Sequence, residues 1–101
     1  MPFTAKIHGK DTSREIIAAC DNEILGKILI DRKKEVEFKV SKEFYGSECF
    51  EWEEIADSIS NGRNVNLVGN NIVELAIKSG LIDPKSVIEI DGVKHAQIYS
   101  I

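Results

Sequence analysis

The spacing of apolar residues along the first forty positions is that of β-strands. Residues 3–8 (FTAKIH) and 36–40 (VEFKV) alternate apolar with polar side chains, and a period of two is typical of strands with one buried face. Residues 15–20 (EIIAAC) and 24–30 (ILGKILI) are predicted to be two more strands, the first of them a hairpin partner of residues 3–8. We therefore expect the first forty residues to form a meander.

The period changes to that of a helix after residue 50. Trp52, Ile55, Ala56 and Ile59 lie at the i, i+3, i+4, i+7 spacing that places them on one helical face. Acidic residues crowd the first turn, where carboxylates interact favourably with the positive end of the helix dipole. The pattern predicts a helix over residues 51–61.

A short strand and a second helix follow. Residues 64–69 (NVNLVG) are predicted to form the strand, and Asn71 is expected to cap the helix, with Glu74 in the capping-box position. Gly80 fits the left-handed residue that commonly ends a helix.

The last predicted element is a β-hairpin whose turn is Asp91 followed by Gly92. This pair is a strong hairpin signal, because both central positions of a type I′ turn need a positive φ. The two-residue turn sets the register, so that His95 lies opposite Ile88 on an apolar face with Gln97 two residues further on.

Together these elements are four strands, a helix, a strand, a helix and two strands (ββββαβαββ). This order predicts an α+β fold, a two-layer sandwich in which two helices pack on one face of a curved, mostly antiparallel sheet. With 101 residues, 43% of them hydrophobic and 30% charged, the chain has the size and composition of a single globular domain over residues 1–101. No apolar run is long enough to span a membrane, and the N-terminal residues lack the apolar segment of a signal peptide. We expect a cytoplasmic protein that has no membrane partner.

Charge is distributed unevenly along the chain. The net charge of −4 argues against a protein whose whole surface binds nucleic acid. Residues 27–42, however, carry six basic side chains against three acidic ones, whereas residues 43–57 carry six acidic side chains and no basic one. The basic stretch surrounds a predicted hairpin turn and points to RNA, a ribonucleoprotein or a protein as partner. A charge run is also the ordinary solvated face of a globular protein, and this alternative stays open.

Aromatic residues cluster directly after the basic stretch. Phe44, Tyr45, Phe50 and Trp52 lie within nine residues, and exposed rings beside basic side chains can stack on RNA bases. The alternative is a corner of the core, which is favoured for Trp52 because it lies on the apolar stripe of the helix. Tyr45, in a predicted turn, fits either alternative. The candidate binding residues are Arg32, Lys33, Lys34, Lys39 and Tyr45.

A second candidate site is the start of the second helix. Gly69, Asn70 and Asn71 lead from a strand into that helix, and a helix N-terminus presents free N–H groups to an anion. The segment is neither a P-loop nor a dinucleotide-binding motif, because both need further glycines. Helix capping is the alternative role of these residues.

His95 and Gln97 can complete such a site, since residues two apart on a strand point to the same side and imidazole titrates near neutral pH. A structural histidine in an ordinary strand is the alternative. Cys20 and Cys49 are isolated, and neither they nor His8 show the spacing of metal ligands. The sequence therefore predicts no metal site and no cofactor.

Four segments carry a resemblance to a known family. They are ACDNEILGK (19–27), VSKEFYGSE (40–48), VNLVGNNIVELAIKSGLID (65–83) and IDGVKHAQI (90–98). In this order, over nearly the whole chain, they resemble the archaeal family of small proteins known as domain of unknown function 424. That family often has proline before the histidine, where this chain has Lys94. The resemblance implies a small cytoplasmic α+β protein, and it brings no catalytic residues.

Two functional hypotheses follow. The first is a non-catalytic binding module that engages RNA, a ribonucleoprotein or a protein partner through the basic hairpin. The second is a small-molecule or anion-binding protein, or an enzyme, with its site at residues 69–71 near His95 and Gln97. The second hypothesis requires these two segments to meet in space.

Overall fold

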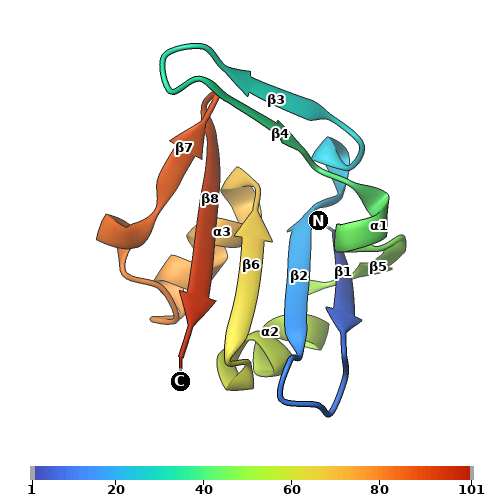
Figure 1. Ribbon diagram of the computed structural model, residues 1–101. Coiled ribbons are helices and arrows are strands. Elements are labelled where there is room, and N and C mark those ends of the chain that lie inside the picture. Colours follow the sequence, from blue (N-terminus) through green and yellow to red (C-terminus); the bar gives the residue numbers. More distant parts are fainter. Residues whose placement is uncertain (1, 101) are drawn as a thin grey trace.

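A six-stranded sheet and a separate two-stranded hairpin form the framework of the computed structural model, which describes residues 2–100 (Figure 1). The strands are β1 (Phe3–His8), β2 (Ile16–Asp21), β3 (Ile28–Asp31), β4 (Val36–Lys39), β5 (Glu48–Phe50), β6 (Asn64–Val68), β7 (Ile88–Ile90) and β8 (Val93–Tyr99). The helices are α1 (Lys42–Tyr45), α2 (Trp52–Asn61) and α3 (Asn70–Lys78), with short 3-10 turns at Asn22–Ile24 and Pro84–Ser86. No helix within residues 2–100 is long and apolar enough to cross a membrane.

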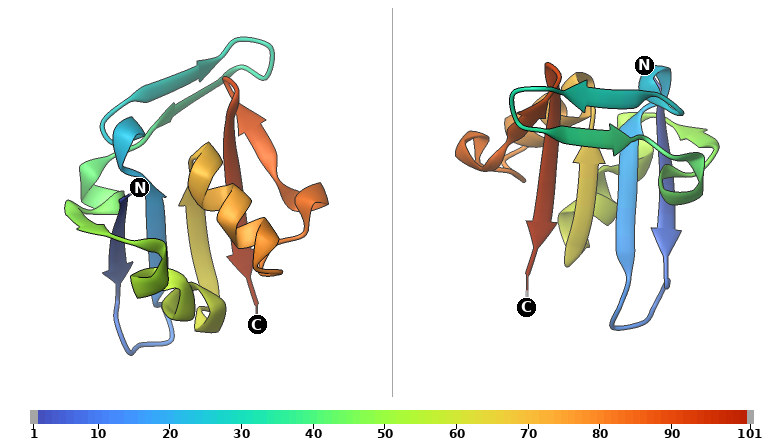
Figure 2. Two further views of the ribbon diagram at one scale, coloured as in Figure 1. Left: turned by 180° about the vertical axis from the view of Figure 1, so that it is seen from behind. Right: turned by 45° about the horizontal axis from the view of Figure 1, so that its top comes forward.

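The large sheet has the strand order β5-β1-β2-β6-β8-β7. Its strand pairs are antiparallel except for β2 and β6, which run parallel. Seen from behind, α2 and α3 lie across one face of this sheet (Figure 2). The predicted α+β fold, a mostly antiparallel sheet with two helices on one face, is confirmed.

The main core lies between these two helices and the sheet. The predicted apolar stripe of α2 places Ile55 and Ile59 in this core, and the helix begins with a capping box between Glu51 and Glu54. From α3 and the strands the core receives Ile72, Val73, Ala76, Ile17, Ala19, Val65, Leu67 and Ala96. Helical and strand periodicity together thus identify the face of each element that is removed from water.

The predicted meander of residues 1–40 is wrong in its second half. β1 and β2 do form the expected antiparallel hairpin, but β3 and β4 pair only with each other and leave the large sheet. The 3-10 turn at Asn22–Ile24 and Gly26, with a φ of +86°, redirect the chain between β2 and β3. A period of two indicates a strand with one buried face, but it does not indicate which surface that face covers.

The β3–β4 hairpin lies across one end of the sheet, on the face opposite α2 and α3 (Figures 1 and 2). Leu29 is buried beneath it in a second apolar cluster, with Val40, Tyr45 and Val68. This cluster covers only part of that face.

Two elements between residues 42 and 50 have no counterpart in the predicted order. Ser41 caps the single-turn helix α1 by accepting a hydrogen bond from the Phe44 N–H at 3.2 Å. The three-residue strand β5 then forms the edge of the large sheet beside β1. Neither element is long enough to show a period, which is why the hydrophobic pattern misses both.

The C-terminal hairpin has the predicted turn and register. Asp91 and Gly92 have φ angles of +52° and +78°, as a type I′ turn requires, and His95 lies opposite Ile88. The side chain of Asp31 joins this turn to the β3–β4 hairpin, because its carboxylate accepts hydrogen bonds from the N–H of Lys34 at 3.1 Å and of Asp91 at 3.0 Å. These N–H groups, that of Asp91 first, hold the pKa of Asp31 below its ordinary value.

We expect acid to release the hairpin from the β7–β8 turn. The pKa of Asp31 is lower in the folded state than the ordinary value of about 3.9, so its contribution is complete above that pH and is lost as the pH falls through the lower folded value. The measurement is the pH dependence of the Asp91 amide shift and its hydrogen exchange, with Asp31→Ala as the test variant. Asp57→Ala, which removes an exposed carboxylate of α2, is the control. An unchanged acid transition in Asp31→Ala would contradict this role.

Candidate functional site on the open face of the sheet

The face of the sheet opposite α2 and α3 is only partly covered. The β3–β4 hairpin and α1 cover one end, and below them the strands β2, β6 and β8 carry no further layer (Figure 1). Strand alternation decides which side chains reach this open face. Ala96 and Ile98 pack with the helices, so His95, Gln97 and Tyr99 lie on the opposite side of β8.

The open face combines exposed apolar groups with amides. Tyr99 is 71% exposed and Ile88 is 51% exposed, and Gln97 is exposed between them along the sheet. Asn64 and Asn66 on β6 are half-buried and lie opposite Tyr99 and Gln97. Tyr99 and both asparagines are not among the site residues predicted from the sequence, although the alternation from residue 95 to 99 indicates that Tyr99 shares a face with His95 and Gln97.

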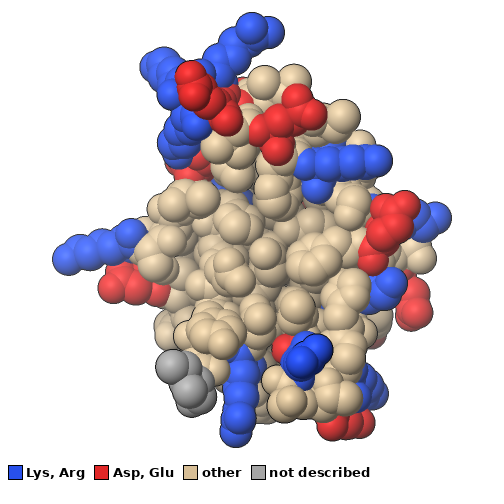
Figure 3. Space-filling model, in the orientation of Figure 1, with Lys and Arg blue, Asp and Glu red and all other residues tan. Residues whose placement is uncertain are grey.

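No carboxylate lies on this face among the strand residues that the structure describes. The strand registers place on it Thr4, Lys6, His8, Ile16, Ala18, Cys20, Cys49, Asn64, Asn66, Val68, Ile88, Ile90, Val93, His95, Gln97 and Tyr99. The space-filling view shows the same arrangement, with charged side chains around the margin of a largely uncharged surface (Figure 3). The acidic residues of the large sheet, Asp21, Glu48 and Glu89, are on the other side of their strands.

Tyr45 is not part of the exposed surface. Its side chain is 1% exposed, and its hydroxyl donates a hydrogen bond to Asn66 Oδ1 at 2.6 Å. Burial raises the pKa of the Tyr45 phenol above its ordinary value. Tyr45 is therefore not available to stack on RNA bases, and its prediction as a binding residue is wrong. The helix α1 turns its ring into the second apolar cluster.

A row of aromatic rings borders the open face beneath the hairpin. His8 stacks on Phe44 with the ring centroids 5.0 Å apart, and Phe44 meets Tyr45 edge-on at 4.9 Å. Phe38 then lies 6.5 Å from Tyr45 and 5.5 Å from His95. The row runs from β1 to β8 and links the two histidines of the chain through contacts between rings.

His95 is a half-buried, neutral side chain rather than an evident catalytic group. Burial lowers the pKa of its imidazole, and within residues 2–100 its enclosed Nε2 has no hydrogen-bond partner. Burial, with a smaller effect of Asp21, raises the pKa of the Cys20 thiol to about 12, so this group is not a nucleophile near neutral pH. No group of three His, Cys, Asp or Glu side chains in the described chain can hold a metal ion.

The start of α3 already holds a carboxylate of the protein itself. Asp21, at the end of β2, accepts hydrogen bonds from the N–H groups of Asn71 at 3.0 Å and Ile72 at 2.9 Å. The prediction that Asn71 caps this helix is therefore wrong. Gly69 is the N-cap residue, and the Asp21 carboxylate supplies the oxygens that accept from the first N–H groups. Burial raises the pKa of Asp21, although the two N–H groups oppose this effect.

The structure divides the second predicted site between two faces of the sheet. The backbones are close, because the Gly69 N–H donates to the Lys94 carbonyl at 2.9 Å. Asn70 accepts from the Lys94 N–H at 2.9 Å. The side chains of His95 and Gln97, however, lie on the open face, whereas α3 packs on the other.

The basic residues predicted for binding lie at and beyond one end of the open face. Arg32, Lys33 and Lys34 form the exposed turn of the β3–β4 hairpin, and Lys39 is exposed on β4. The Lys34 ammonium donates to the backbone carbonyl of Glu89 on β7. The hairpin turn is thereby held beside the strand that carries Ile88.

Comparison with known proteins agrees with this fold. The chain matches the model of the family described as "Protein of unknown function (DUF424)" over residues 8–101. Its structure is similar to the crystal structure of an uncharacterized conserved protein from the archaeon Methanopyrus kandleri, with a TM-score of 0.79 and 24% sequence identity over 98% of this chain and 91% of that chain. No curated protein matches the chain.

Gly69→Ala is expected to destabilise the fold more than the same change at Gly80. At Gly69, where φ is +127°, a Cβ atom would lie 2.7 Å from Asp21 Oδ2 and would separate that carboxylate from the helix. At Gly80, where φ is +75°, a Cβ atom would meet nothing within 4 Å, so only backbone strain of about 1–2 kcal/mol applies. Urea unfolding measures both, and a loss of about 3 kcal/mol or more is expected for Gly69→Ala. Equal losses would show that the Asp21 contact is unimportant.

Acidification is expected to destabilise the protein through His95. Its folded-state pKa lies below the ordinary value of about 6.5, so its contribution is complete above that pH and is lost as the pH falls through the lower folded value. NMR titration of the two histidine rings, with His95→Phe to assign them, measures this pKa directly. A His95 ring that titrates at or above the ordinary value would contradict the effect of burial.

Proposed function

This chain belongs to the DUF424 family of proteins of unknown function, and we propose that it is a non-catalytic binding module that holds single-stranded RNA across the open face of its sheet. The observation that carries the proposal is the absence of carboxylates from that face in the described strands, together with an exposed aromatic ring and a set of amides. Phosphates are repelled by carboxylates, so in this acidic protein a face whose described strands carry none suits a nucleic acid.

The side chains on the face match the needs of unpaired bases. Tyr99 offers a ring for stacking, and base stacking on aromatic side chains is the common basis of single-strand binding by sheets. Gln97 is exposed and carries an amide group that can donate to and accept from base edges, whereas Asn66 Oδ1 already accepts from Tyr45 and Asn64 Oδ1 is enclosed. The half-buried His95 lies between these groups and the aromatic row under the hairpin.

The hairpin turn supplies positive charge at one end of the same face. Arg32 and Lys33 are exposed there, and Lys34 fixes the turn beside β7. Asp31 directs its carboxylate to the N–H groups of Lys34 in this turn and of Asp91 in the β7–β8 turn, so Glu35 is the exposed carboxylate beside the turn's three cations. Backbone phosphates of a strand that crosses β8 and β7 would meet Arg32 and Lys33 as it leaves the sheet. This role fits a cytoplasmic protein.

A protein or ribonucleoprotein partner is the second candidate. Exposed isoleucines support it, because Ile88 lies on the open face and Ile28 and Ile30 lie on the outer side of the hairpin beside Lys39. The alternative of an anion or small-molecule site at residues 69–71 is disfavoured, since the Asp21 carboxylate occupies that helix start.

We expect labelled single-stranded RNA to bind with a strong salt dependence that the hairpin controls. Fluorescence anisotropy over a range of salt concentrations gives the affinity and its salt slope. Tyr99→Ala should weaken binding by about 1–3 kcal/mol, the value of one stacked base. Reversal of Arg32 and Lys33 to glutamate should lower the salt slope by about 0.7 for each phosphate that no longer pairs with a cation. Lys34 is left intact because it holds the hairpin in place.

The matched control reverses two exposed lysines away from the open face, Lys78 at the end of α3 and Lys85 in the Pro84–Ser86 turn. It changes the net charge equally and should bind RNA nearly as the unaltered protein does. Equal losses in the control and the hairpin variant would mean that only net charge matters. Unaltered affinity in Tyr99→Ala, or no binding of any single-stranded RNA at low salt, would reject the proposal in favour of a protein partner.

A further inference from the structure

The strand β1 continues past its neighbour β5. β5 pairs only with Phe3, Thr4 and Ala5, whereas β1 continues to His8 and pairs with β2 along its whole length. Beyond Ala5, no strand among the described residues accompanies β1 on its outer side. An unaccompanied strand edge presents backbone N–H and C=O groups that another extended chain can bind.

Gly46 explains where the protein's own chain first meets this edge. Its φ is +85°, and a Cβ atom there would lie 2.6 Å from the Ala5 carbonyl oxygen. The backbone therefore approaches β1 closely at Gly46 and then enters β5, which accompanies only the first residues of β1. The rest of the outer edge of β1 has no partner strand within residues 2–100, because β5 starts opposite Ala5.

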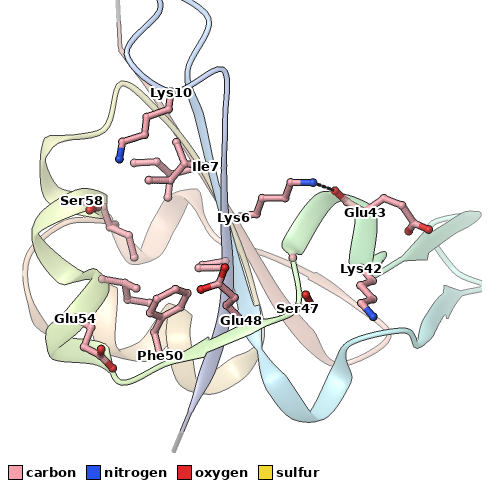
Figure 4. Close-up of a pocket in the computed structure, with 16 residues that line it drawn as sticks. Lys6, Ile7, Lys10, Lys42, Glu43, Ser47, Glu48, Phe50, Glu54 and Ser58 are labelled. Atoms are coloured by element: carbon pink, nitrogen blue, oxygen red, sulfur yellow. Dashed lines mark hydrogen bonds between the residues drawn. The ribbon is translucent and has the colours of Figure 1, made fainter.

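A groove of about 760 Å³ lies directly beside this open edge, between β1 and α2 (Figure 4). Its apolar lining comes from both elements and from neighbouring strands, and consists of Ala5, Ile7, Ile17, Ala19, Phe50, Ile55 and Ile59. The volume is within the range of about 300–1,000 Å³ that is usual for ligand sites. A strand edge beside a helix, with an apolar floor between them, is the arrangement by which sheets bind extended peptides.

On the α2 side of β1, charges of opposite sign stand at the two ends of the groove, whose lining on the α1 side also includes Lys42 and Glu43. Lys10 lies at the end reached by β1 after His8, and Glu48 and Glu54 lie toward the other (Figure 4). Ser58 of α2 borders the groove near Lys10, opposite Ile7. The separation of charges suits a segment with an acidic residue at one end and a basic residue at the other.

We propose that this groove binds an extended peptide segment of a partner protein, which adds to the edge of β1 antiparallel to it and in line with β5. The segment places an apolar side chain on the floor between Ile7 and Ile55. Its N-terminal acidic residue meets Lys10, and its C-terminal basic residue meets Glu48 and Glu54. This site is separate from the open face and does not depend on RNA binding.

The test uses a capped synthetic peptide with isoleucine at two alternate positions, aspartate at the N-terminal end and lysine at the C-terminal end. In a ¹⁵N NMR titration, saturable shifts and slower amide exchange are expected at Ile7 and His8, the part of β1 beyond the approach of Gly46, where the new hydrogen bonds form. A peptide with proline between the isoleucines lacks one N–H and should bind at least 10-fold more weakly. Exchange of the two charged ends should also weaken binding.

Two substitutions on α2 make a matched pair. Ser58→Trp fills the groove and should weaken binding of the first peptide at least 10-fold, whereas Ser60→Trp, at an exposed position of the same helix outside the groove lining, should leave it unaltered. Lys10→Glu should favour the charge-exchanged peptide over the original.

Three results would overturn the proposal. They are the absence of shifts at millimolar peptide, equal binding of the proline peptide, and equal loss in both tryptophan variants. Octanoate serves as a probe for the competing possibility, because it is apolar and anionic but has no N–H groups. If octanoate saturates the groove and the peptide does not, the site is a small-molecule pocket.

Discussion

Asp21 holds the centre of the fold together. Because β2 and β6 run parallel, their carboxyl ends lie at the same edge of the sheet, and the helix that follows β6 begins beside the end of β2. The Asp21 carboxylate lies there and accepts from two N–H groups of α3, which would otherwise have no partner within the helix. Gly69 permits this approach, since any side chain at that position would occupy the space of the carboxylate. The same bonds that position α3 explain why its N-terminus is not a general anion site.

The placement of the hairpin determines which surface is left for binding. With α2 and α3 on one side of the sheet, the β3–β4 hairpin is free to cover the other, but two short strands cover only one end of a six-stranded sheet. Asp31 attaches the far end of the hairpin to the β7–β8 turn and Lys34 attaches it to Glu89 of β7, so that the hairpin covers the sheet only up to a defined edge. Below this edge the open face begins, with His95 at the border and Tyr99 at the far end of β8.

The distribution of charge follows from the same arrangement. In α2 the acidic residues occupy the first turn and the outer side, where they cap the helix and contact water. In the strands, acidic residues such as Glu48 and Glu89 alternate away from the open face. A protein with a net charge of −4 therefore has one face on which carboxylates are absent from the described strands. The net charge alone gives no indication of this face, because it averages over surfaces that a ligand meets separately.

The sequence by itself determined the elements whose signals are local. The stripe of α2, the Asp91–Gly92 turn and the pairing of His95 with Ile88 follow from periodicity and turn chemistry, since each depends on residues that are neighbours along the chain. The family resemblance was also recoverable from short segments, and the family match confirms it.

Only the tertiary structure decided which surfaces these elements cover. The separation of β3–β4 from the sheet, the parallel pairing of β2 with β6 and the burial of Tyr45 depend on contacts between distant residues, for which a period of two or an isolated aromatic residue carries no information. The capping of α3 by Asp21 joins residues fifty positions apart and is likewise absent from any local pattern. The candidate site itself, an open face made from separate strands, exists because the hairpin is too small to cover the sheet.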